Sequence, residues 1–308
     1  MSTIALCIPA YNAENFLPRL LDSAVKQIIP FDEILVYDDC STDSTAKIAE
    51  FYKAKVITGN KNIGCSKGKN IIANLSRSEW IHFHDADDEL LPNFTSLAHK
   101  WINNQQNSDV VLFNYEYRDN DTHELIDTRK FDAQALIDDP IKYAISEQIN
   151  PFCGLYNKEK FIAVGGYDTD EKVLYNEDCA MHIKLAIAGF KFSVESEVSI
   201  INYRIKNSMS QGNQLKCFEA QYHVMTKYKA LTTVQYDVTF GYKLWEIAGL
   251  AASYRDYRLA NSCITLARKL NVKKPSGFTL FGLLCVLQPY LAIRIRENYI
   301  RLFKPELR

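Results

Sequence analysis

The chain has 308 residues, of which 47% are hydrophobic and 24% charged, and its formal net charge is −1. This composition is ordinary for a globular protein and excludes a disordered chain or a fibre. The balanced charge creates no overall basic field for nucleic acid, so a charged partner has to be recognised by a local group of residues. The length is sufficient for a main α/β domain with an appendage.

The first 117 residues alternate short apolar runs with helix-like runs, a pattern that predicts a parallel sheet wrapped by helices. The expected strands are residues 4–9, 33–38, 55–58, 80–83 and 109–117. The expected helices are residues 13–27 with Asn12 as the cap, a second helix opened by Asp43 and Ser44, and a third over 66–75.

The stretch from 118 to 139 is polar and receives no assignment. Order returns with an apolar run at 152–156, a helix after Lys158, a helix over 176–188 that Gly189 ends, and two further short strands. From about residue 212 the pattern is almost entirely helical, so we place a domain boundary at residue 210. The predicted fold class is α/β, with a mixed, mostly parallel, Rossmann-like sheet flanked by helices and a helical C-terminal region over 211–308.

Polar loops follow four of the expected strands. Because the carboxyl ends of parallel strands share one edge of a sheet, these loops should line one nucleotide-sized pocket. The loops are Pro9-Ala-Tyr11-Asn12, Asp38-Asp39-Cys-Ser-Thr-Asp43, Asn62-Ile-Gly64 with Lys69-Asn70, and Asp85-Ala86-Asp87-Asp88.

The acidic loop provides three closely spaced carboxylates directly after a buried strand. Hard oxygen ligands of this kind suit Mg²⁺ or Mn²⁺ that carries a phosphate. The stretch could equally be a solvated loop before a helix that Pro92 helps to start, since carboxylates are common at such positions. From these residues alone both interpretations stay open.

The other loops also have two interpretations each. Asp38 and Asp39 could bind a base or ribose, or could cap the following helix, which is the interpretation we favour for the pair alone. Lys67 and Lys69 could neutralise a diphosphate or be solvated helix lysines. Tyr11 could stack on a base or pack against the wall of the pocket.

The order and spacing of these loops resemble those of inverting glycosyltransferases of family 2, which have the GT-A fold of the nucleotide-diphospho-sugar transferase superfamily. In that family Pro-x-Tyr-Asn, Asp-Asp-x-Ser-x-Asp, Asn-x-Gly and a strand ending in Asp-x-Asp-Asp occur in this order. The resemblance covers about residues 3–210. It implies a catalytic domain over 1–210, with the nucleotide-sugar site in 1–118 and the acceptor side in 119–210.

The resemblance also implies roles for individual residues. Asp87, with Asp85, would hold Mg²⁺ or Mn²⁺ against the diphosphate. The residues that would bind the donor are Pro9, Tyr11, Glu14, Asp38, Asp39, Asn62, Gly64, Lys69, Asp85, Ala86, Asp87, Arg204 and Lys206.

Three positions depart from the family pattern. Lys69 stands where the family usually has arginine, so the charge is kept but the planar fork is lost. His84 replaces an aliphatic residue, and a buried histidine satisfied by a neighbouring strand is the favoured interpretation. Lys206 stands where a histidine often lies, and a protonated lysine has no lone pair for a metal.

The catalytic acids implied by the resemblance are Glu177 and Asp178, at the start of a predicted helix. The Gly165-Gly166-Tyr167-Asp168 turn precedes them, as it does in the family, and Asp178 is the candidate general base. For the acidic pair alone, favourable interaction with the helix dipole is the simpler explanation.

Residues 276–308 are apolar and then basic. Gln288 and Pro289 interrupt the apolar part, which is shorter than the roughly 20 residues of a membrane span. An amphipathic helix among anionic lipid headgroups is one interpretation. A helix packed on the catalytic domain or in a homodimer interface is the other.

These observations predict an enzyme, a metal-dependent hexosyltransferase of EC class 2.4. It would move a sugar from a nucleotide diphosphate donor, expected to be a UDP-sugar, to a hydroxyl of a glycan or lipid-linked acceptor. Biosynthesis of a bacterial surface polysaccharide, such as lipopolysaccharide or capsule, is the expected setting. The alternatives are a sugar-nucleotide nucleotidyltransferase and a non-catalytic glycan-binding or scaffold subunit.

The eight cysteines are scattered and form no Cys-x-x-Cys pair, and no basic stretch followed by an apolar core opens the chain. Both features favour free thiols in a cytoplasmic protein. The tail adds the expectation of peripheral contact with the inner face of the cytoplasmic membrane.

Overall fold

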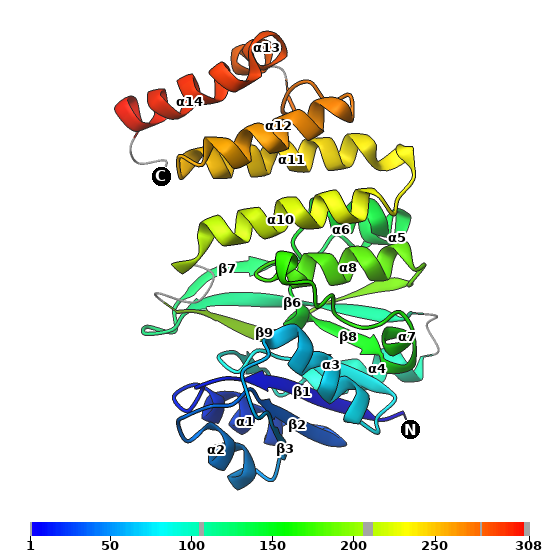
Figure 1. Ribbon diagram of the computed structural model, residues 1–308. Helices are drawn as coiled ribbons and strands as arrows, with labels where there is room; N and C mark the ends of the chain where they lie inside the picture. The colour runs from blue at the N-terminus through cyan, green and yellow to red at the C-terminus, as the bar shows by residue number, and fades with distance from the viewer. Residues whose placement is uncertain (1, 105–107, 206–211, 278, 305–308) are drawn as a thin grey trace. The chain divides into compact units, whose positions relative to one another are not determined.

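The computed structural model describes residues 2–104, 108–205, 212–277 and 279–304 (Figure 1). The chain forms two compact units. Unit 1 consists of Met1–Pro140, Ile149–Thr169 and Lys184–Ser208, and unit 2 of Ile141–Gln148, Asp170–Ile183 and Met209–Arg308. Two short segments before residue 208 thus group with the C-terminal helices, and the proposed division at residue 210 stays a prediction.

One mixed sheet forms the centre of unit 1. In the described part of the chain its strand order is β3-β2-β1-β4-β8-β6-β9-β5, with β7 paired to β6. The strands β3, β2, β1 and β4 are mutually parallel, and β6 is parallel to β9. The strands are β1 (Ile4–Ala10), β2 (Glu33–Asp38), β3 (Lys55–Thr58), β4 (Trp80–Phe83), β5 (Glu89–Leu90), β6 (Val110–Asp119), β7 (Leu125–Arg129), β8 (Gly154–Asn157) and β9 (Phe192–Arg204).

Helices cover this sheet, which confirms the predicted α/β fold class. The helix α3 packs on β1 and β2, while α1 and α2 pack against each other. The chain runs from β1 to β3 in one direction and then returns to β4 on the other side of β1. Right-handed connections between these parallel strands explain why α3 packs apart from α1 and α2. The helices lying wholly in unit 1 are α1 (Leu17–Val25), α2 (Thr45–Phe51), α3 (Cys65–Leu75), α4 (Phe94–Asn103), α5 (Ala133–Asp138) and α7 (Lys158–Ala163).

The strand order reverses between β1 and β4, which are direct neighbours in the sheet. In open α/β sheets the crevice at the carboxyl ends of such a strand pair is the usual ligand site. The core strand β1 is fully buried from Ile4 to Ile8, as expected for a parallel strand covered on both faces. A rigid centre therefore positions the loops that follow β1 and β4.

Several local predictions were wrong. The first helix begins at Leu17 rather than at 13, and Asn12 caps no helix but has a left-handed φ of 48°. One 13-residue strand, β9, replaces the two short strands expected after Gly189. The unassigned stretch after 118 contains the β6–β7 hairpin and α5. These features depend on pairing between distant segments, which local periodicity does not report.

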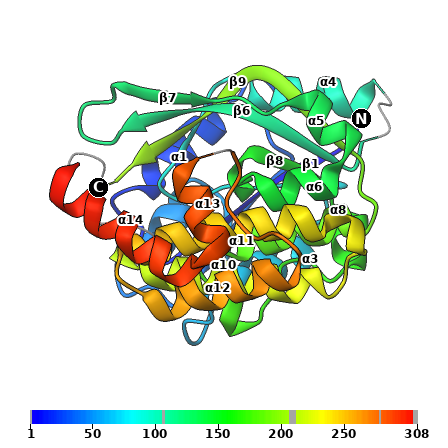
Figure 2. The same cartoon turned by 90° about the horizontal axis from the view of Figure 1, so that it is seen from above.

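Unit 2 is helical, as the pattern from residue 212 predicts. Its helices α11 and α12 pack on each other. A Cβ on Gly241 of α11 would lie 2.3 Å from Val272, which follows α12, so this approach fits only a glycine. Trp245 Nε1 donates to the carbonyl of Val272 at 3.0 Å. The helix α14 lies across α11 and α12 (Figure 2). The C-terminal helices are α10 (Gln214–Lys229), α11 (Asp237–Ser253), α12 (Tyr257–Lys269), α13 (Leu280–Leu287) and α14 (Pro289–Phe303).

Two further helices contain residues of unit 2, namely α6 (Pro140–Ser146) and the first part of α8 (Glu177–Ile187). Over the described ranges, no helix is both long and apolar enough to cross a membrane.

Candidate functional site

The loops that follow β1 and β2 are held together by hydrogen bonds. The backbone N–H of Asn12 donates to Ser41 Oγ at 2.9 Å, and Asn12 Oδ1 accepts from the backbone N–H of Thr42 at 2.9 Å. Glu14 accepts from the backbone N–H of Ser44 at 2.9 Å. Asn12 and Glu14 therefore tie the first loop to the second.

The acidic pair after β2 is buried and bonded to backbone. Asp39 accepts from the N–H groups of Ile63 and Gly64, at 2.7 and 2.8 Å, one on each carboxylate oxygen. Asp38 accepts from the N–H of Ser41 at 3.1 Å. Asp39 thus holds the loop before α3. The favoured interpretation, that Asp39 caps the helix after β2, was wrong.

The glycines and lysines at the start of α3 have separate tasks. Gly64 precedes the helix with a φ of 88°, a conformation that favours glycine. Gly68 gives room to Tyr37, whose ring would lie 2.7 Å from an added Cβ. Lys67 is exposed, as expected of a solvated lysine.

Lys69, in contrast, is buried, with only 2% of its side chain exposed. Its Nζ lies 3.5 Å from Asp85 Oδ1 and 5.1 Å from the centre of the Tyr167 ring. The neighbouring Asn70 exchanges two hydrogen bonds with the backbone of Tyr167, at 2.8 and 3.0 Å. An added Cβ on Gly166 would lie 2.3 Å from Asn70 Oδ1, so this turn fits only against a glycine. The predicted Gly-Gly-Tyr turn therefore orients Lys69 beside the acidic loop.

The three aspartates of the acidic loop differ in environment. The side chain of Asp85 is 36% exposed and faces Lys69. Burial, together with the nearby charge of Asp85, raises the pKa of Asp87 to about 6. Burial and the charges of both neighbours raise the pKa of Asp88 well above its ordinary value. Three carboxyl groups therefore lie close together at this point, and burial disfavours the charged forms of two of them.

Asp88 is committed to the fold. It is fully buried, and its carboxylate accepts two hydrogen bonds from Asn202 Nδ2, at 2.8 and 2.9 Å, and one from the N–H of Tyr203 at 3.0 Å. These bonds anchor the end of β9 to the acidic loop. Asp85 and Asp87 are the two carboxylates of the loop left for a ligand.

Arg19, a residue of α1 that no sequence motif indicated, supports the acidic loop. Its guanidinium donates to the backbone carbonyl of Asp87 and, at 3.1 Å, to Asn120 Oδ1, and it stacks 3.7 Å over the ring of Tyr203. Its partners lie 68 or more residues away in the sequence, so no local pattern could have indicated it.

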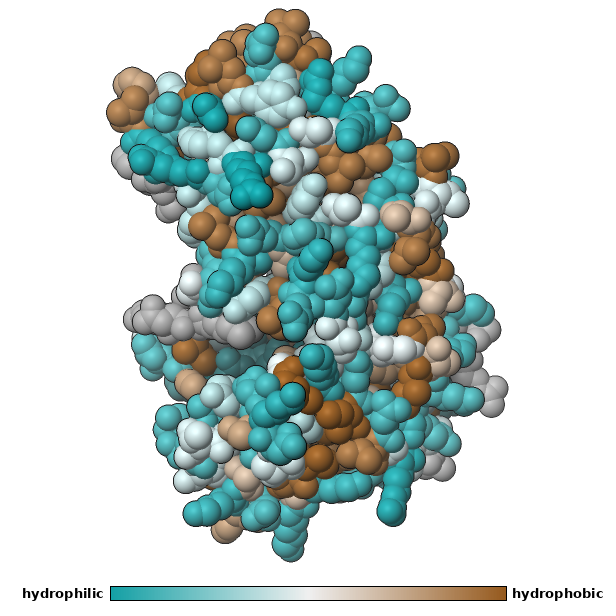
Figure 3. Space-filling view, viewed as in Figure 1, coloured by the Kyte–Doolittle hydropathy of each residue, from teal (hydrophilic) through white to brown (hydrophobic). Residues whose placement is uncertain are grey.

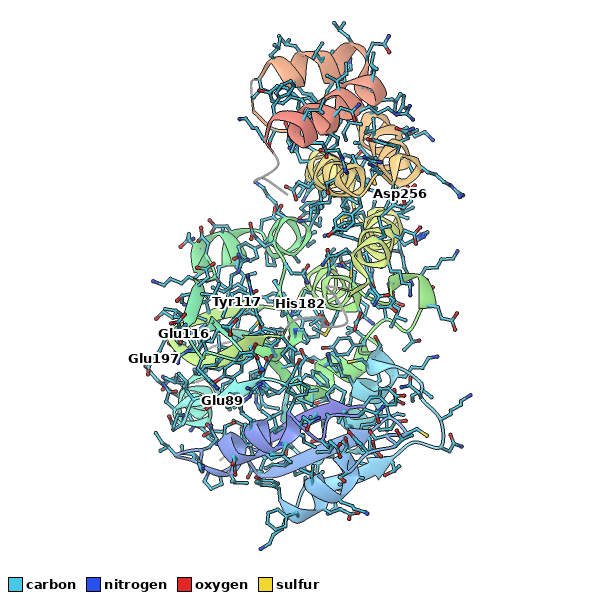
Figure 4. The ribbon with its side chains drawn as sticks, turned by 90° about the vertical axis from the view of Figure 1, so that its left-hand side faces the viewer. Glu89, Glu116, Tyr117, His182, Glu197 and Asp256 are labelled. Atoms are coloured by element: carbon cyan, nitrogen blue, oxygen red, sulfur yellow. The ribbon has the colours of Figure 1, made fainter. Side chains whose placement is uncertain are left out.

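The same area contains the residues at the end of β9. Tyr203 donates its hydroxyl to Glu89 at 2.7 Å, and Arg204 lies 4.9 Å over the ring of Tyr117. Figure 4 shows Glu89 and Tyr117 on the elements that flank β9. Arg204 is exposed beside the acidic loop's anchor, and Lys206 lies outside the described residues.

The remaining predicted donor residues differ in exposure. Tyr11 is 52% exposed, which leaves its ring accessible to a ligand. Asn62 is exposed too, whereas Pro9 and Ala86 are half-buried. All the predicted donor residues within the described ranges belong to unit 1.

His84 is fully buried and pairs with a second histidine. His82 Nδ1 must donate to the carbonyl of Gly154 at 2.8 Å, which leaves His82 Nε2 to accept from His84 Nδ1 at 2.9 Å. Burial lowers the pKa of His84 to about 3 and that of His82 well below its ordinary value. His84, which directly follows β4, thus bonds His82 of that strand, and the backbone of Phe152, just before the neighbouring β8, is a further hydrogen-bond partner.

Glu177 and Asp178 form the first turn of α8 and belong to unit 2. Glu177 is buried, Asp178 is half-buried, and the carbonyl of Asp178 lies 2.8 Å from His182 Nδ1. Tyr175, just before the helix, has a φ of 76°. The sharp backbone turn at Tyr175 and the buried Glu177 fix the position of Asp178 within unit 2.

The residues of the acidic loop fit a divalent cation that is shared with a ligand. Over the ranges that the structure covers, no group of three or more histidine, cysteine, aspartate or glutamate side chains could hold a metal alone. Asp85 and Asp87 provide two oxygen-bearing side chains that the fold does not use as Asp88 is used. This suits Mg²⁺ or Mn²⁺, which are commonly held by one or two carboxylates plus substrate phosphates.

This fold, with its acidic loop at the switch point, defines the GT-A class of nucleotide-sugar transferases. The family model described as Glycosyl transferase family 2 matches residues 5–164, about half of the chain. The chain belongs to that family, and the resemblance recognised in its loops is confirmed.

Relatives and solved structures support the same assignment. The chain is 32% identical over 119 residues to the poly(ribitol-phosphate) β-N-acetylglucosaminyltransferase TarS of Staphylococcus aureus, over 36% of this chain and 21% of that protein. It is 22% identical over 208 residues to an uncharacterised glycosyltransferase of Haemophilus influenzae, covering 67% of this chain and 70% of that one. The TarS match thus spans about a fifth of that relative's length.

The structure of S. aureus TarS 1-349 in complex with UDP-GlcNAc matches with a TM-score of 0.74 at 18% identity, covering 97% of this chain and 92% of that chain. The mannosyltransferase PcManGT of Pyrobaculum calidifontis, in complex with GDP-Man and Mn²⁺, matches with a TM-score of 0.62 at 15% identity, over 99% of this chain and 81% of that chain. At these identities the structural matches establish the fold.

Proposed function

We propose that this protein transfers a sugar, with inversion, from a nucleotide diphosphate donor to a hydroxyl of a glycan or lipid-linked acceptor. The observation that carries the proposal is the Asp85–Asp87 pair at the switch point, faced by the buried Lys69. Charge concentrated at a strand end of this fold needs a cation and a phosphate as its counterpart.

In this proposal the donor's nucleoside lies in the pocket of the first three loops. Asp39 keeps the loop before α3 in place through Ile63 and Gly64, and Tyr11 offers an exposed ring on which a base can stack. Pro9, Glu14, Asp38 and Asn62 complete the lining. Lys69, Arg204 and Lys206 are the proposed cationic residues on the diphosphate side.

Asp87 and Asp85 would hold the Mg²⁺ or Mn²⁺ ion, and Ala86 between them leaves the loop without a bulky side chain. When bound, the ion stabilises the negative charge of the departing nucleotide diphosphate. The contribution of the chain is to orient the loop, through Arg19 on the backbone of Asp87 and through Asp88 on β9.

Asp178 is the proposed general base, and Glu177 beside it is the second proposed catalytic acid. Asp178 would take the proton from the acceptor hydroxyl while the oxygen attacks the anomeric carbon and the bond to the diphosphate breaks. A direct displacement of this kind inverts the anomeric centre. General-base assistance contributes typically about 10²–10⁴-fold to the rate.

The donor is proposed to be a UDP-sugar. The support is the similarity to TarS, whose structure contains UDP-GlcNAc, although PcManGT holds GDP-Man in the same fold. Synthesis of a bacterial surface polysaccharide, lipopolysaccharide or capsule, is the proposed setting. The proposal places the enzyme in the cytoplasm, because the eight cysteines are scattered through the sequence and form no Cys-x-x-Cys pair.

The proposal is tested by turnover of a panel of UDP- and GDP-sugars with Mn²⁺, Mg²⁺ or EDTA. We expect release of the nucleotide diphosphate from at least one donor, dependent on metal and lost in Asp87→Asn. The matched control is Asp127→Asn, an exposed aspartate on β7. Metal-independent release, or release unchanged in Asp87→Asn, would refute it.

A further inference from the structure

The C-terminal helices of unit 2 concentrate positive charge. From Tyr257 to Lys304 the sequence contains nine lysines and arginines but a single acidic residue, Glu297, although the whole chain has a net charge of −1. Glu297 is itself only 2% exposed and forms an ion pair with Arg296 at 2.7 Å. The surface of this segment is therefore cationic while the rest of the chain is acidic.

The helix α14 also presents an apolar stripe to solvent. The side chains at positions i, i+4, i+8 and i+11 lie on one face of a helix. On α14 these are the exposed residues Leu291, Ile295, Tyr299 and Leu302. The opposite face, with Ala292, Ile293 and Glu297, is the buried one, so the stripe plays no part in the core of unit 2.

The helix α13 extends the exposed apolar surface. The exposed fractions of Leu280 and Leu287 are 76% and 75%, and Leu283 and Leu284 are exposed as well. The two helices are adjacent in sequence and pack on each other. Figure 3 shows hydrophobic side chains over the region that Figure 1 labels α13 and at the left-hand end of α14, with hydrophilic side chains between them. We call these leucines and the α14 stripe the apolar surface.

Cationic side chains border this surface. Arg294 and Arg296 flank the stripe residue Ile295 in the sequence. Arg294 stacks at 5.0 Å on Tyr257, and Arg296 stacks at 5.5 Å on Phe281 of α13. Arg301 is fixed by donating to the carbonyl of Ser253. Long basic side chains around an apolar face, with tyrosine at its edge, are the combination that suits the headgroup region of an anionic bilayer.

We infer that the apolar surface of α13 and α14 docks on an anionic lipid membrane, with the leucines and the α14 stripe below the headgroups and the bordering cations among the lipid phosphates. Charge decides for this partner over a second copy of the chain, because two such surfaces facing each other would bring like charges together. The inference adds a docking face to the proposed use of a lipid-linked acceptor, but it rests on unit 2 alone and does not require glycosyl transfer.

Flotation of the full-length protein with vesicles tests the inference. We compare vesicles of phosphatidylcholine alone with vesicles that contain about 30% phosphatidylglycerol, since each basic residue near an anionic surface strengthens binding. We expect wild type to float with the anionic vesicles and much less with the neutral ones. Leu287→Glu/Leu291→Glu and Arg294→Glu/Lys304→Glu should each weaken the partition coefficient about tenfold or more.

Two double variants serve as matched controls. Leu231→Glu/Val234→Glu changes two exposed apolar residues of unit 2 outside the surface, and Lys26→Glu/Lys47→Glu reverses two exposed lysines of unit 1. Both should float like wild type. A thermal shift with UDP and Mn²⁺ is measured for every variant, so loss of donor binding is distinguished from loss of docking.

Three results would overturn the inference. The first is equal flotation of wild type with neutral and anionic vesicles, and the second is unchanged flotation of Leu287→Glu/Leu291→Glu. The third combines two observations: no protein floats with either kind of vesicle, and wild type self-associates in sedimentation velocity whereas Leu287→Glu/Leu291→Glu does not. The apolar surface would then be an interface between two copies of the chain.

Discussion

Nζ of the buried Lys69 lies 3.5 Å from Oδ1 of Asp85, so a cation on α3 faces the acidic loop of β4. Asn70, the next residue of α3, bonds the backbone of Tyr167 and so holds this part of the helix, with Lys69, against the turn. The fit requires a glycine at 166, because Asn70 leaves no room for a side chain there. The contact joins the segment of Lys69 to the loop of Asp85, and neither of these two motifs indicates a binding site when taken alone. It places opposite charges where a metal–diphosphate group is expected to bind.

Replacing Lys69 should weaken donor binding. In Lys69→Met the diphosphate loses a buried cation, so we expect its binding to weaken by about 1–2 kcal/mol of binding free energy. The loss is no larger because Asp85 is partly exposed and solvent screens the pair. Lys69→Arg should bind at least as well as wild type. Isothermal titration with Mn²⁺ present measures both, and Lys67→Met, at an exposed lysine of the same helix, is the control. Equal Kd values for Lys69→Met and Lys67→Met would contradict the role of Lys69.

Asp88 should matter for stability in a way that Asp85 does not. Asp88→Ala removes the acceptor of Asn202 Nδ2 and of the Tyr203 N–H, and unpaired buried donors cost about 1–3 kcal/mol each. We expect the free energy of unfolding in urea to fall by about 2–4 kcal/mol. The more exposed Asp85→Ala should stay within about 1 kcal/mol of wild type without ligand. An equal loss of unfolding free energy in Asp88→Ala and Asp85→Ala would contradict the structural role assigned to Asp88.

Asp87→Asn should stabilise the ligand-free protein while removing its response to metal. The folded pKa of Asp87, about 6, lies above the ordinary 3.8, so its contribution to stability falls as the pH rises from 3.8 to 6 and stays low above that. At pH 8 with EDTA the variant should gain up to about 3 kcal/mol. Adding Mn²⁺ and UDP should stabilise wild type but not the variant. A variant less stable than wild type under metal-free conditions would contradict the argument.

The histidine pair should make stability depend on pH in the opposite sense. The folded pKa of His84 is lowered to about 3 by burial, so between 6.5 and 3 the unfolded chain binds the proton that the folded chain does not. The contribution of His84 to stability is therefore lost as the pH falls through this window, at up to about 1.4 kcal/mol per pH unit.

The variant His84→Asn isolates this effect, since Asp87 and Asp88 titrate in both proteins. Its deficit in unfolding free energy relative to wild type should shrink by about 1 kcal/mol per unit between pH 6 and pH 4. A difference that stays constant with pH would show that His84 does not bind the proton differently in the two states.

Local sequence patterns were sufficient for the strands of the parallel half and for the loops that end them. The apolar runs at β1, β2 and β4 were recognised because buried parallel strands are almost continuously hydrophobic, whereas the edge strand β3 has a shorter apolar run and no buried residue. The order of the polar loops then indicated the family, which the match over residues 5–164 confirms.

The supports of the site could not be predicted in the same way. Arg19 binds a backbone carbonyl 68 residues away, and Asp88 binds Asn202 across 114 residues. Neither contact leaves a periodic signal, because each depends on where the sheet brings the chain back. The interpretation of Asp39 as a helix cap was wrong for the same reason, since its partners Ile63 and Gly64 belong to the next loop.

The central claim is that Asp178 accepts the proton from the acceptor while Asp87 serves the metal-bound donor. The most direct measurement is the single-turnover rate of Asp178→Asn with saturating donor and Mn²⁺, beside a titration of donor binding to the same variant. The account predicts donor affinity like that of wild type and a rate lower by about 10²–10⁴-fold. Turnover by Asp178→Asn at the wild-type rate would contradict it.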